Sequence, residues 1–313
     1  MTNTRPASRL EVEVAGLTLQ NPVLLAAGTA GYGRELADVI KLDALGGLVT
    51  KAVSLEPRGG APSPRVTEFG AGMLNAVGLA NPGVEAVRQE HLPWLASHLT
   101  RAKVLVNVVG STVDDFVAVV ERLEDVPGKH GFELNVSCPN VKSGGLEFGS
   151  DPTSLRELVR RARQATRLPL FVKLSPSLPD IAATASIALE AGASGLTLVN
   201  TMPGLVIDVE SRRPVLGYGT GGVSGGGLLP VGVLATAKVY RATRAPIIGV
   251  GGIASATDAL QYLIAGARAV AIGTAAMRDP RLPERLIVDL AAWCEVRGID
   301  SIASLTGTLE WPS

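Results

Sequence analysis

The stretch LFVKLSPSLPDIAATASIALEAGASGLTLVNT (170–201) decides the fold of this chain. Two runs that are almost continuously apolar, residues 170–175 and 195–201, flank a helical pattern over residues 178–191. Gly192 suits the left-handed backbone that commonly follows a helix. Strands buried on both faces have this composition, and a helix between two of them predicts a parallel βαβ unit. The segment therefore predicts an α/β fold.

The same unit repeats along the chain. Six further apolar runs alternate with amphipathic segments, namely PVLLAAG (22–28), GLVTKAV (47–53), KVLVNVVG (103–110), FELNVSC (132–138), PIIGVGG (246–252) and AVAIGTA (269–275). One helix is predicted over 154–166, with Asp151 as its cap and Pro152 in its first turn. Eight strand–helix repeats favour a closed (β/α)8 TIM barrel over an open doubly wound sheet.

Three segments depart from this repeat. LEVEVAGLTLQ (10–20) alternates apolar and polar residues around Ala15-Gly16, which predicts an N-terminal β-hairpin at the bottom of the barrel. Residues 54–81 and 202–228 are rich in glycine or proline and lack a helical period. Both follow predicted strands, so we expect long loops at the C-terminal face, where barrel enzymes place their sites. Because no linker or low-complexity segment is present, residues 1–313 are expected to form a single domain.

Composition limits the class of partner and the compartment. Hydrophobic residues make up 46% of the chain, and Lys+Arg and Asp+Glu are both 29. Balanced charge without a basic block gives no support to nucleic-acid binding. The two cysteines, Cys138 and Cys294, are too few for a disulfide framework and indicate a reducing compartment. No apolar run reaches membrane-spanning length and no signal-like segment begins the chain, so we expect a cytoplasmic protein without a membrane anchor.

Polar residues gather at the C-terminal ends of five predicted strands. Burying an unpaired amide or ammonium group is unfavourable, so a ring of such groups needs a polar partner such as a bound ligand. One strand-end lysine alone commonly extends to solvent, but the coincidence across five strands favours a ligand site. The residues are Lys51, Asn107, Asn135 with Ser137 and Cys138, Lys173, and Asn200 with Thr201.

The last two strands end in glycine, in GVGGI (249–253) and IGT (272–274). Such junctions let a phosphate approach backbone N–H groups, and barrels often hold phosphate after strands seven and eight. Gly225, in GGVSGGG (221–227), is a further candidate contact. The residues alone thus predict a barrel that binds a phosphorylated aromatic or heterocyclic ligand beside two lysines, several amides and one cysteine. They do not name the reaction.

The segment ELNVSCPNVKSGGLEFGSDP (133–152) resembles the signature loop of the class 1 dihydroorotate dehydrogenases, and its NVKxGGxxFGxDP part is most similar to class 1B catalytic subunits. The resemblance covers nearly the whole chain, because NPVLLAAGTAGYG, VTKAVSLEPRGG, MLNAVGLANPG, FVKLSP, LVNTMPG, GVGGI and AIGTA follow in the family's order. It implies an FMN-dependent oxidoreductase that converts dihydroorotate to orotate in de novo pyrimidine (UMP) biosynthesis. A C5 proton goes to a base and a C6 hydride to FMN.

The resemblance also implies a role for each matching residue. Cys138 is the general base on a loop that closes over the substrate, and Lys173 faces the N1/O2 edge of the flavin. The substrate is held by Lys51, Asn75, Ala76, Val77, Gly78, Leu79, Asn135, Asn200 and Thr201. FMN is contacted by Ala27, Gly28, Lys51, Ala52, Asn107, Asn135, Lys173, Val199, Gly225, Gly251, Gly252, Gly273 and Thr274. No metal site is expected in this chain.

The chain departs from the family pattern at two places. GGVSGGG (221–227) replaces the usual GGLSGPA, and losing the proline is expected to loosen the loop at Gly225. Ala27 stands where relatives often carry serine, which removes one possible hydrogen bond. Cys294 lies in the helical run LAAWCEVRG and is assigned to packing.

Class 1B proteins work with a second subunit that carries FAD and a [2Fe–2S] cluster and passes electrons to NAD+. This chain has no cysteine cluster of its own, so that partner, like a homodimer core of a heterotetramer, is implied by resemblance only. Three alternatives stay open: a fumarate-dependent homodimeric class 1A enzyme, a phosphate-binding barrel enzyme without flavin, and a non-catalytic binding subunit. The NVKxGGxxFG run argues against the first, the NVSCPN loop against the second, and the presence of Cys138 and Lys173 against the third.

Overall fold

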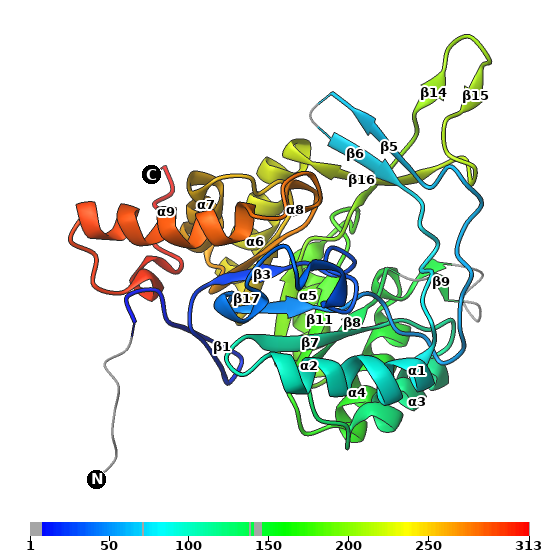
Figure 1. Cartoon of the computed structure of the whole chain (residues 1–313), viewed down its shortest axis with the longest axis horizontal. Helices are drawn as coiled ribbons and strands as arrows, with labels where there is room; N and C mark the ends of the chain where they lie inside the picture. The colour runs from blue at the N-terminus through cyan, green and yellow to red at the C-terminus, as the bar shows by residue number, and fades with distance from the viewer. Residues whose placement is uncertain (1–7, 71, 138, 141–145, 313) are drawn as a thin grey trace.

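The fold is a closed barrel of parallel strands, seen in a computed structural model that describes residues 8–70, 72–137, 139–140 and 146–312 (Figure 1). Each of the eight predicted apolar runs forms one barrel strand, so the predicted TIM barrel is confirmed. In order around the barrel the strands are β3 (Val23–Leu25), β4 (Gly47–Val49), β7 (Lys103–Val108), β8 (Gly131–Asn135), β11 (Leu170–Leu174), β12 (Gly195–Leu198), β17 (Ile247–Val250) and β18 (Ala269–Ile272).

Helices follow the strands around the outside of the barrel. They are α1 (Val84–Ala86), which continues through a π-helical turn (Val87–His91) into α2 (Leu92–His98), then α3 (Val113–Leu123), α4 (Pro152–Ala165), α5 (Ile181–Glu190), α6 (Leu229–Thr243), α7 (Ala256–Ala265), α8 (Thr274–Arg278) and α9 (Leu282–Val296). Short 3₁₀ turns cover Arg34–Leu36, Leu42–Ala44, Phe148–Ser150, Gly226–Leu228 and Ile302–Leu305.

Side-chain caps explain where two of these helices begin. Asp151 caps α4 as predicted, because its carboxylate accepts from the backbone N–H groups of Thr153 and Ser154. Helix α5 begins at Ile181 rather than at residue 178. The reason is that Asp180 supplies its cap, accepting from the two backbone N–H groups that follow Ile181.

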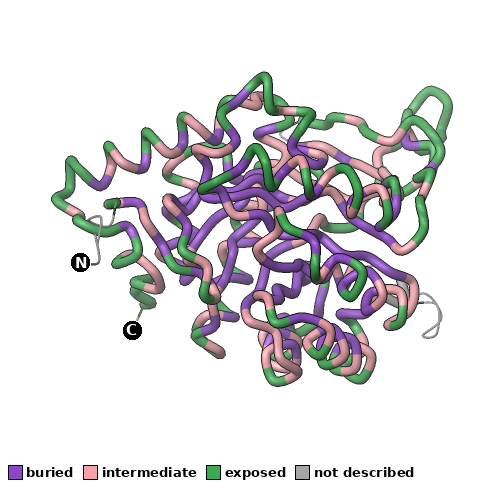
Figure 2. The backbone as a smooth tube through the Cα atoms, turned by 60° about the horizontal axis from the view of Figure 1, so that its bottom comes forward, coloured by how far each residue is buried: buried purple, intermediate pink, exposed green. Residues whose placement is uncertain are grey.

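The core lies within the barrel and between the barrel and its helices. Figure 2 shows the buried backbone concentrated in the central strands and the exposed backbone in the outer turns. Every residue of β3, β4, β11, β12, β17 and β18 is buried, which explains why these strands are almost continuously apolar rather than alternating.

The predicted N-terminal hairpin is also present. β1 (Val12–Val14) pairs with β2 (Leu17–Leu19), and both turn residues have positive φ, 51° at Ala15 and 84° at Gly16, as a type I′ turn requires. Arg268, just before β18, donates to the carbonyl oxygen of Glu13. The hairpin therefore lies at the N-terminal end of the strands, the bottom of the barrel.

The two irregular segments form an antiparallel sheet, here called the accessory sheet, instead of separate loops. Its order is β13-β16-β6-β5, and a small hairpin from the same region extends away from the barrel (Figure 1). The strands are β5 (Val66–Phe69), β6 (Gly72–Asn75), β13 (Met202–Gly204) and β16 (Gly221–Gly225), and the hairpin consists of β14 (Ile207–Asp208) and β15 (Arg213–Pro214). A separate two-stranded ladder joins β9 (Pro139–Asn140) to β10 (Leu146–Glu147).

The accessory sheet places Gly225 in a strand, whereas the loosening expected from the lost proline stays a prediction. Residues 221–225 form strand β16, which pairs with β13 on one side and β6 on the other. Gly222 and Val223 are in register with both neighbours, whereas Ser224 and Gly225 pair with β6 alone. This pairing forms a strand although the sequence has little intrinsic preference for one.

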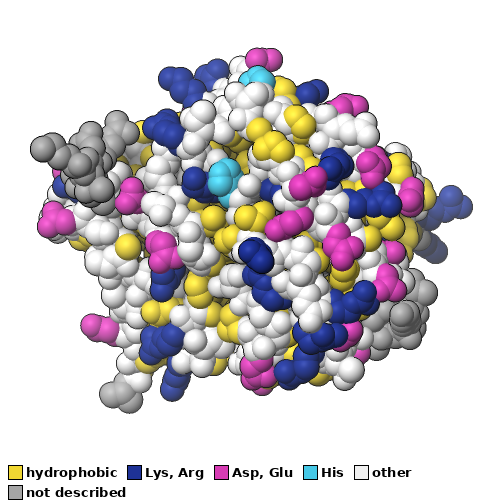
Figure 3. Space-filling model, turned by 90° about the horizontal axis from the view of Figure 1, so that it is seen from below, with side chains coloured by type: hydrophobic (Ala, Val, Ile, Leu, Met, Phe, Trp, Pro, Cys, Tyr) yellow, Lys and Arg dark blue, Asp and Glu magenta, His cyan; other side chains and the backbone are white. Residues whose placement is uncertain are grey.

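The distribution of charged side chains on the surface agrees with the balanced charge of the chain. On the face shown in Figure 3, basic and acidic side chains are interspersed, with hydrophobic side chains between them. Within the described ranges, no helix is both long enough and apolar enough to cross a membrane.

Candidate active site

The amides predicted to bind substrate meet at the C-terminal ends of β8 and β12. The Nδ2 of Asn200 donates to the Oδ1 of Asn135 over 3.3 Å. The Oδ1 of Asn200 in turn accepts from the backbone N–H of Thr201 over 2.9 Å. These three residues come from two strands that are not neighbours in the barrel, and they form one connected polar group.

Asn75 reaches the same group through the accessory sheet. It lies at the end of β6, in register with Gly222 of β16, and its Nδ2 donates to the Gly222 carbonyl oxygen over 3.3 Å. A Cβ atom on Gly222 would lie 2.2 Å from the Thr201 Oγ1, so the backbone of Gly222 contacts Thr201 directly. The sheet therefore brings Asn75 beside Thr201.

The backbone N–H groups that follow Asn75 are not all hydrogen-bonded within the protein. The N–H of Ala76 donates to the carbonyl oxygen of Arg65. In the described part of the chain, the N–H groups of Val77, Gly78 and Leu79 have no acceptor. Gly78 and Leu79 both have positive φ, 69° and 56°. These three N–H groups remain available to a ligand.

Lys173 is a largely buried lysine of the barrel wall. It lies on β11 in register with Asn135 and Thr197, and only 6% of it is exposed. Its ammonium group forms no hydrogen bond or ion pair with another described residue. A largely buried lysine whose ammonium has no protein partner favours an anionic or strongly polar ligand beside it.

The loops after β3 and β4 lie beside each other at the same end of the barrel. The N–H of Lys51 donates to the Gly31 carbonyl oxygen over 2.7 Å, and the Tyr32 hydroxyl donates to the Ala52 carbonyl oxygen over 3.0 Å. Burial raises the pKa of Tyr32, so its hydroxyl stays a donor. Ala27 is half-buried and Gly28 is exposed with a φ of 82°.

A polar cluster that the sequence did not reveal lies deeper in the barrel. The Asn107 Nδ2 and the Thr197 Oγ1 each donate to the Glu133 carboxylate over 2.7 Å. All three side chains are at least 99% buried. The other amide atom, Asn107 Oδ1, is buried without a partner among the described residues. The one available signal was a carboxylate inside the otherwise apolar strand FEL (132–134).

The glycines predicted to hold phosphate converge. Thr274 Oγ1 donates to Ser224 Oγ over 2.8 Å, which places the loop after β18 beside Gly225. Gly252 has a φ of 72°, and a Cβ atom there would lie 2.5 Å from the Leu229 nitrogen. The loop after β17 therefore contacts the start of α6, which follows Gly225 closely.

The remaining predicted contacts lie on the same strands and loops. Val199 is buried after β12 and donates its N–H to the Val250 carbonyl oxygen. Gly251 follows β17 with a φ of 126°, and Gly273 immediately precedes α8. All of these positions lie at the C-terminal ends of barrel strands.

The structure describes one of the two cysteines. Cys138 lies outside the described residues. Cys294 is fully buried on α9, and burial raises the pKa of its thiol, as expected for a packing residue. Within the described ranges, no group of three His, Cys, Asp or Glu side chains has the geometry of a metal site.

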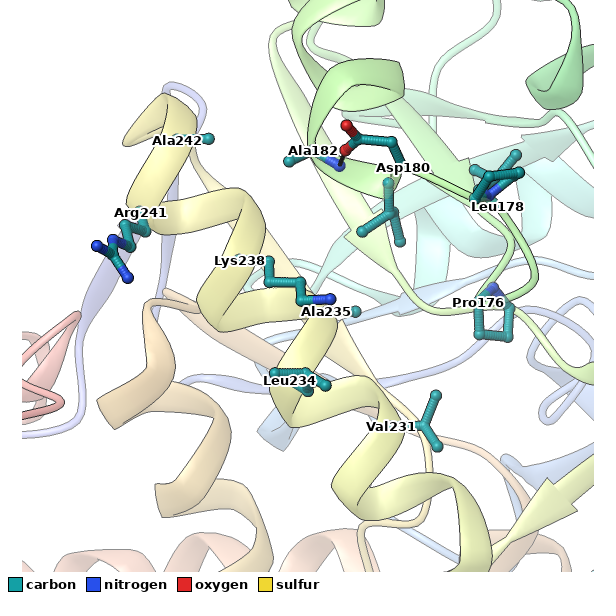
Figure 4. A pocket seen from close by; sticks show the side chains of 12 residues that line it. Pro176, Leu178, Asp180, Ala182, Val231, Leu234, Ala235, Lys238, Arg241 and Ala242 are labelled. Carbon is teal, nitrogen blue, oxygen red and sulfur yellow. Dashed lines mark hydrogen bonds between the residues drawn. The ribbon is translucent and has the colours of Figure 1, made fainter. Parts of the chain in front are cut away.

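A large cavity lies elsewhere, on the outer side of the barrel. It has a volume of about 710 Å³ and lies between α6 and the segment that leads into α5 (Figure 4). Leu234 and Lys238 of α6 face Pro176 and Asp180 across it. None of the predicted substrate or cofactor residues lines it, so it is separate from the candidate site.

Comparisons with known proteins show the family of the chain. The family model for dihydroorotate dehydrogenase matches residues 9–293. The chain is 46% identical over 301 residues to the "Dihydroorotate dehydrogenase B (NAD(+)), catalytic subunit" of Pelobacter propionicus, covering 96% of this chain and 98% of the relative. It is 49% identical over 296 residues to the protein of the same name from Desulforudis audaxviator, covering 95% and 96%.

The same family emerges from solved structures. The crystal structure of DHODH in complex with ferulenol from Eimeria tenella superposes with a TM-score of 0.82 at 26% identity, covering 98% of this chain and 90% of that one. The fold and these matches define the class as a flavin-dependent barrel oxidoreductase. More particularly, the chain belongs to the dihydroorotate dehydrogenase family, whose members oxidise dihydroorotate to orotate in pyrimidine synthesis. The predicted enzyme class and NAD+-linked type are confirmed.

Proposed function

We propose that this protein is the FMN-binding catalytic subunit of an NAD+-linked dihydroorotate dehydrogenase. The observation that carries the cofactor assignment is that two polar groups of the site have no partner among the described residues. One is the Lys173 ammonium and the other is the Asn107 Oδ1. A flavin's polar edge presents both acceptors and an N–H donor, so these residues fit it.

The substrate side follows from the converging amides. Asn75, Asn135, Asn200 and Thr201, with Lys51, would hold the ring and carboxylate of dihydroorotate. The N–H groups of residues 77–79 add backbone donors. Holding the substrate in one orientation allows a modest base to act, because proximity replaces intrinsic basicity.

Two side chains carry the chemistry in this proposal. Cys138, assigned from its sequence match, takes the C5 proton as thiolate. Bound FMN supplies the hydride acceptor for C6. Lys173 stabilises negative charge at the N1/O2 edge electrostatically. The convergence of Gly225, Gly252 and Thr274 suits the FMN phosphate, with Gly251 and Gly273 beside them.

The partner assignments rest on the relatives' names. Those proteins are named as NAD(+) enzymes and as catalytic subunits, and the word subunit implies a partner. We propose that this chain likewise passes electrons to NAD+ through a subunit carrying FAD and a [2Fe–2S] cluster. We further propose a homodimer core, a single-domain catalytic chain and a cytoplasmic location.

The test is the visible spectrum of the purified chain before and after anaerobic addition of dihydroorotate. We expect a flavin spectrum that bleaches. In Cys138→Ala the flavin should remain bound, and reduction should slow by at least about 100-fold, the usual contribution of a general base. Cys294→Ala is the matched control and should bleach at the wild-type rate.

Each contrary result removes a different part of the proposal. A yellow protein that does not bleach rejects dihydroorotate as substrate. A colourless protein that takes up no added FMN rejects the cofactor. Equal bleaching rates in wild type and Cys138→Ala reject Cys138 as the base.

A further inference from the structure

Glu133 is a fully buried carboxylate that the proposed reaction does not use. It lies on β8 with 0% exposure, and its partners come from two other strands. Asn107 of β7 donates to its Oε1, and Thr197 of β12 donates to its Oε2. Since β11 separates β8 from β12, the second contact skips a strand. Such a contact is possible across the concave interior of a barrel.

The carboxylate determines which way the Asn107 amide faces. A carboxylate presents only acceptor oxygens, so the side chain of Asn107 must turn its NH₂ toward Glu133. Its Oδ1 is then directed away from Glu133, and this oxygen is buried without a partner among the described residues. Asn107 therefore offers a ligand an acceptor, not a donor. Thr197 donates to the second carboxylate oxygen, so both oxygens of Glu133 have a partner.

The cluster lies directly beneath the residues assigned to the flavin. Glu133 and Asn107 are in register on β8 and β7. Two residues further along β8, Asn135 is in register with Lys173 of β11. Residues two apart in a strand share a face, so Asn107, Glu133 and Lys173 all point into the barrel. Around this edge, the charged side chains of the described strands and strand ends are Lys51, Glu133 and Lys173.

We infer that Glu133 is a positioning residue that fixes the Asn107 amide with its oxygen toward the N3–H of the flavin. This inference rests on the proposed FMN site. The oxidised flavin ring has one N–H donor, at N3, so an acceptor aimed at its polar edge pairs with that group. Lys173 serves the neighbouring N1/O2 edge. Glu133 itself touches neither flavin nor substrate.

The variant Glu133→Gln tests the inference because it keeps size and hydrogen-bond number. A glutamine can offer Asn107 either its oxygen or its NH₂, and the Thr197 hydroxyl can satisfy the other atom as donor or acceptor. The orientation of Asn107 is then no longer dictated. In this variant the Asn107 NH₂ can turn inward and donate to a deprotonated N3.

The measurement is a spectrophotometric titration of the FMN-bound protein at alkaline pH, which follows ionisation of N3–H. We expect the pKa of N3–H in Glu133→Gln to fall below the wild-type value by on the order of one to two pH units, as a hydrogen bond to a charged group allows. Asn107→Ala should also lower it, because the acceptor is gone. Thr197→Val keeps the Glu133–Asn107 pair and should leave the N3–H pKa at the wild-type value.

The dissociation constant for FMN and the thermal unfolding midpoint of the apoprotein are measured alongside. A Glu133→Gln protein with altered stability but wild-type N3–H ionisation overturns the inference and leaves Glu133 a structural residue. Unchanged ionisation in Asn107→Ala overturns it independently, even where Glu133→Gln fails to fold. A wild-type protein that binds no FMN instead rejects the proposed function, a result that is visible before any variant is compared.

Discussion

The barrel strands and the accessory sheet differ in burial and in what holds their strands together. Barrel strands such as β11 and β12 are buried along their whole length and apolar apart from a few polar side chains. Strand β16, in contrast, is GGVSG, with every residue half-exposed. Burial holds the first kind of strand in place. The second kind depends on ladder bonds to partners far away in sequence.

The two regions contribute different residues to the candidate site. The barrel supplies Asn135, Lys173 and Asn200 from rigid strands, whereas the accessory sheet supplies Asn75 and places Gly222 against Thr201. We therefore expect damage to the barrel to appear as lost stability. Damage to the sheet should appear as lost catalytic efficiency in a protein that is still folded.

The largest effect is expected in the barrel. Phe132 of β8 is fully buried, so Phe132→Ala should lower the free energy of unfolding by about 3–5 kcal/mol, the usual result of a large core truncation. Ile207→Ala is the matched control beside the accessory sheet, where 53% of the side chain is exposed. It should change stability by less than about 0.5 kcal/mol. Chemical denaturation measures both, and equal losses would contradict the comparison.

A smaller and different effect is expected from Gly222→Ala. The new Cβ atom would lie 2.2 Å from Thr201 Oγ1, so Thr201 must move. We expect kcat/KM for dihydroorotate to fall by about tenfold, since small misplacements of binding groups are costly. FMN content and the unfolding midpoint should stay near wild type. Gly227→Ala, where a Cβ atom meets nothing within 4 Å, is the control and should retain full activity.

The smallest effect concerns pH and the bottom of the barrel. Burial, followed by the nearby Lys103 and Lys129, lowers the pKa of His130, and its Nδ1 accepts from the Val104 N–H over 3.1 Å. A histidine whose pKa is lowered on folding stabilises the protein above its ordinary pKa of 6.5, and this contribution is lost as pH falls through the folded-state pKa.

Because His130 is only half-buried, the loss should be under about 1 kcal/mol after allowing for solvent screening. It is measured as the fall of the unfolding midpoint between neutral and mildly acidic pH. His130→Asn keeps an acceptor for Val104 but does not titrate, so its midpoint should fall less. A steeper fall in the variant would show that His130 is not the responsible group.

Much of the fold was predictable because its determinants are local. A strand buried on both faces, such as residues 170–174, differs from its surroundings in composition alone, and Asp151-Pro152 marks the start of α4. The start of α5 was misplaced because Leu178 continues the apolar period, whereas the cap that decides the boundary is Asp180. The accessory sheet was missed because Gly222 has no strand preference, and its partner Asn75 lies 147 residues away.

The candidate site likewise contains residues that could be predicted from the sequence and residues that could not. Strand-end polar residues such as Asn135 and Asn200 stand out in apolar runs, and the structure brings them together. Glu133 was overlooked because the role of a single carboxylate in a strand cannot be inferred until its hydrogen-bond partners are known. Those partners are Asn107 on β7 and Thr197 on β12, two strands that are far apart in the sequence.

The pairing of β6 with β16 also restricts how this protein can diverge. An insertion or deletion within residues 72–75 shifts every contact with residues 221–225, so a change in one segment requires a compensating change in the other. The two segments should therefore drift as a linked pair across lineages. The turn between β14 and β15 is free of this restriction and is where length variation should accumulate.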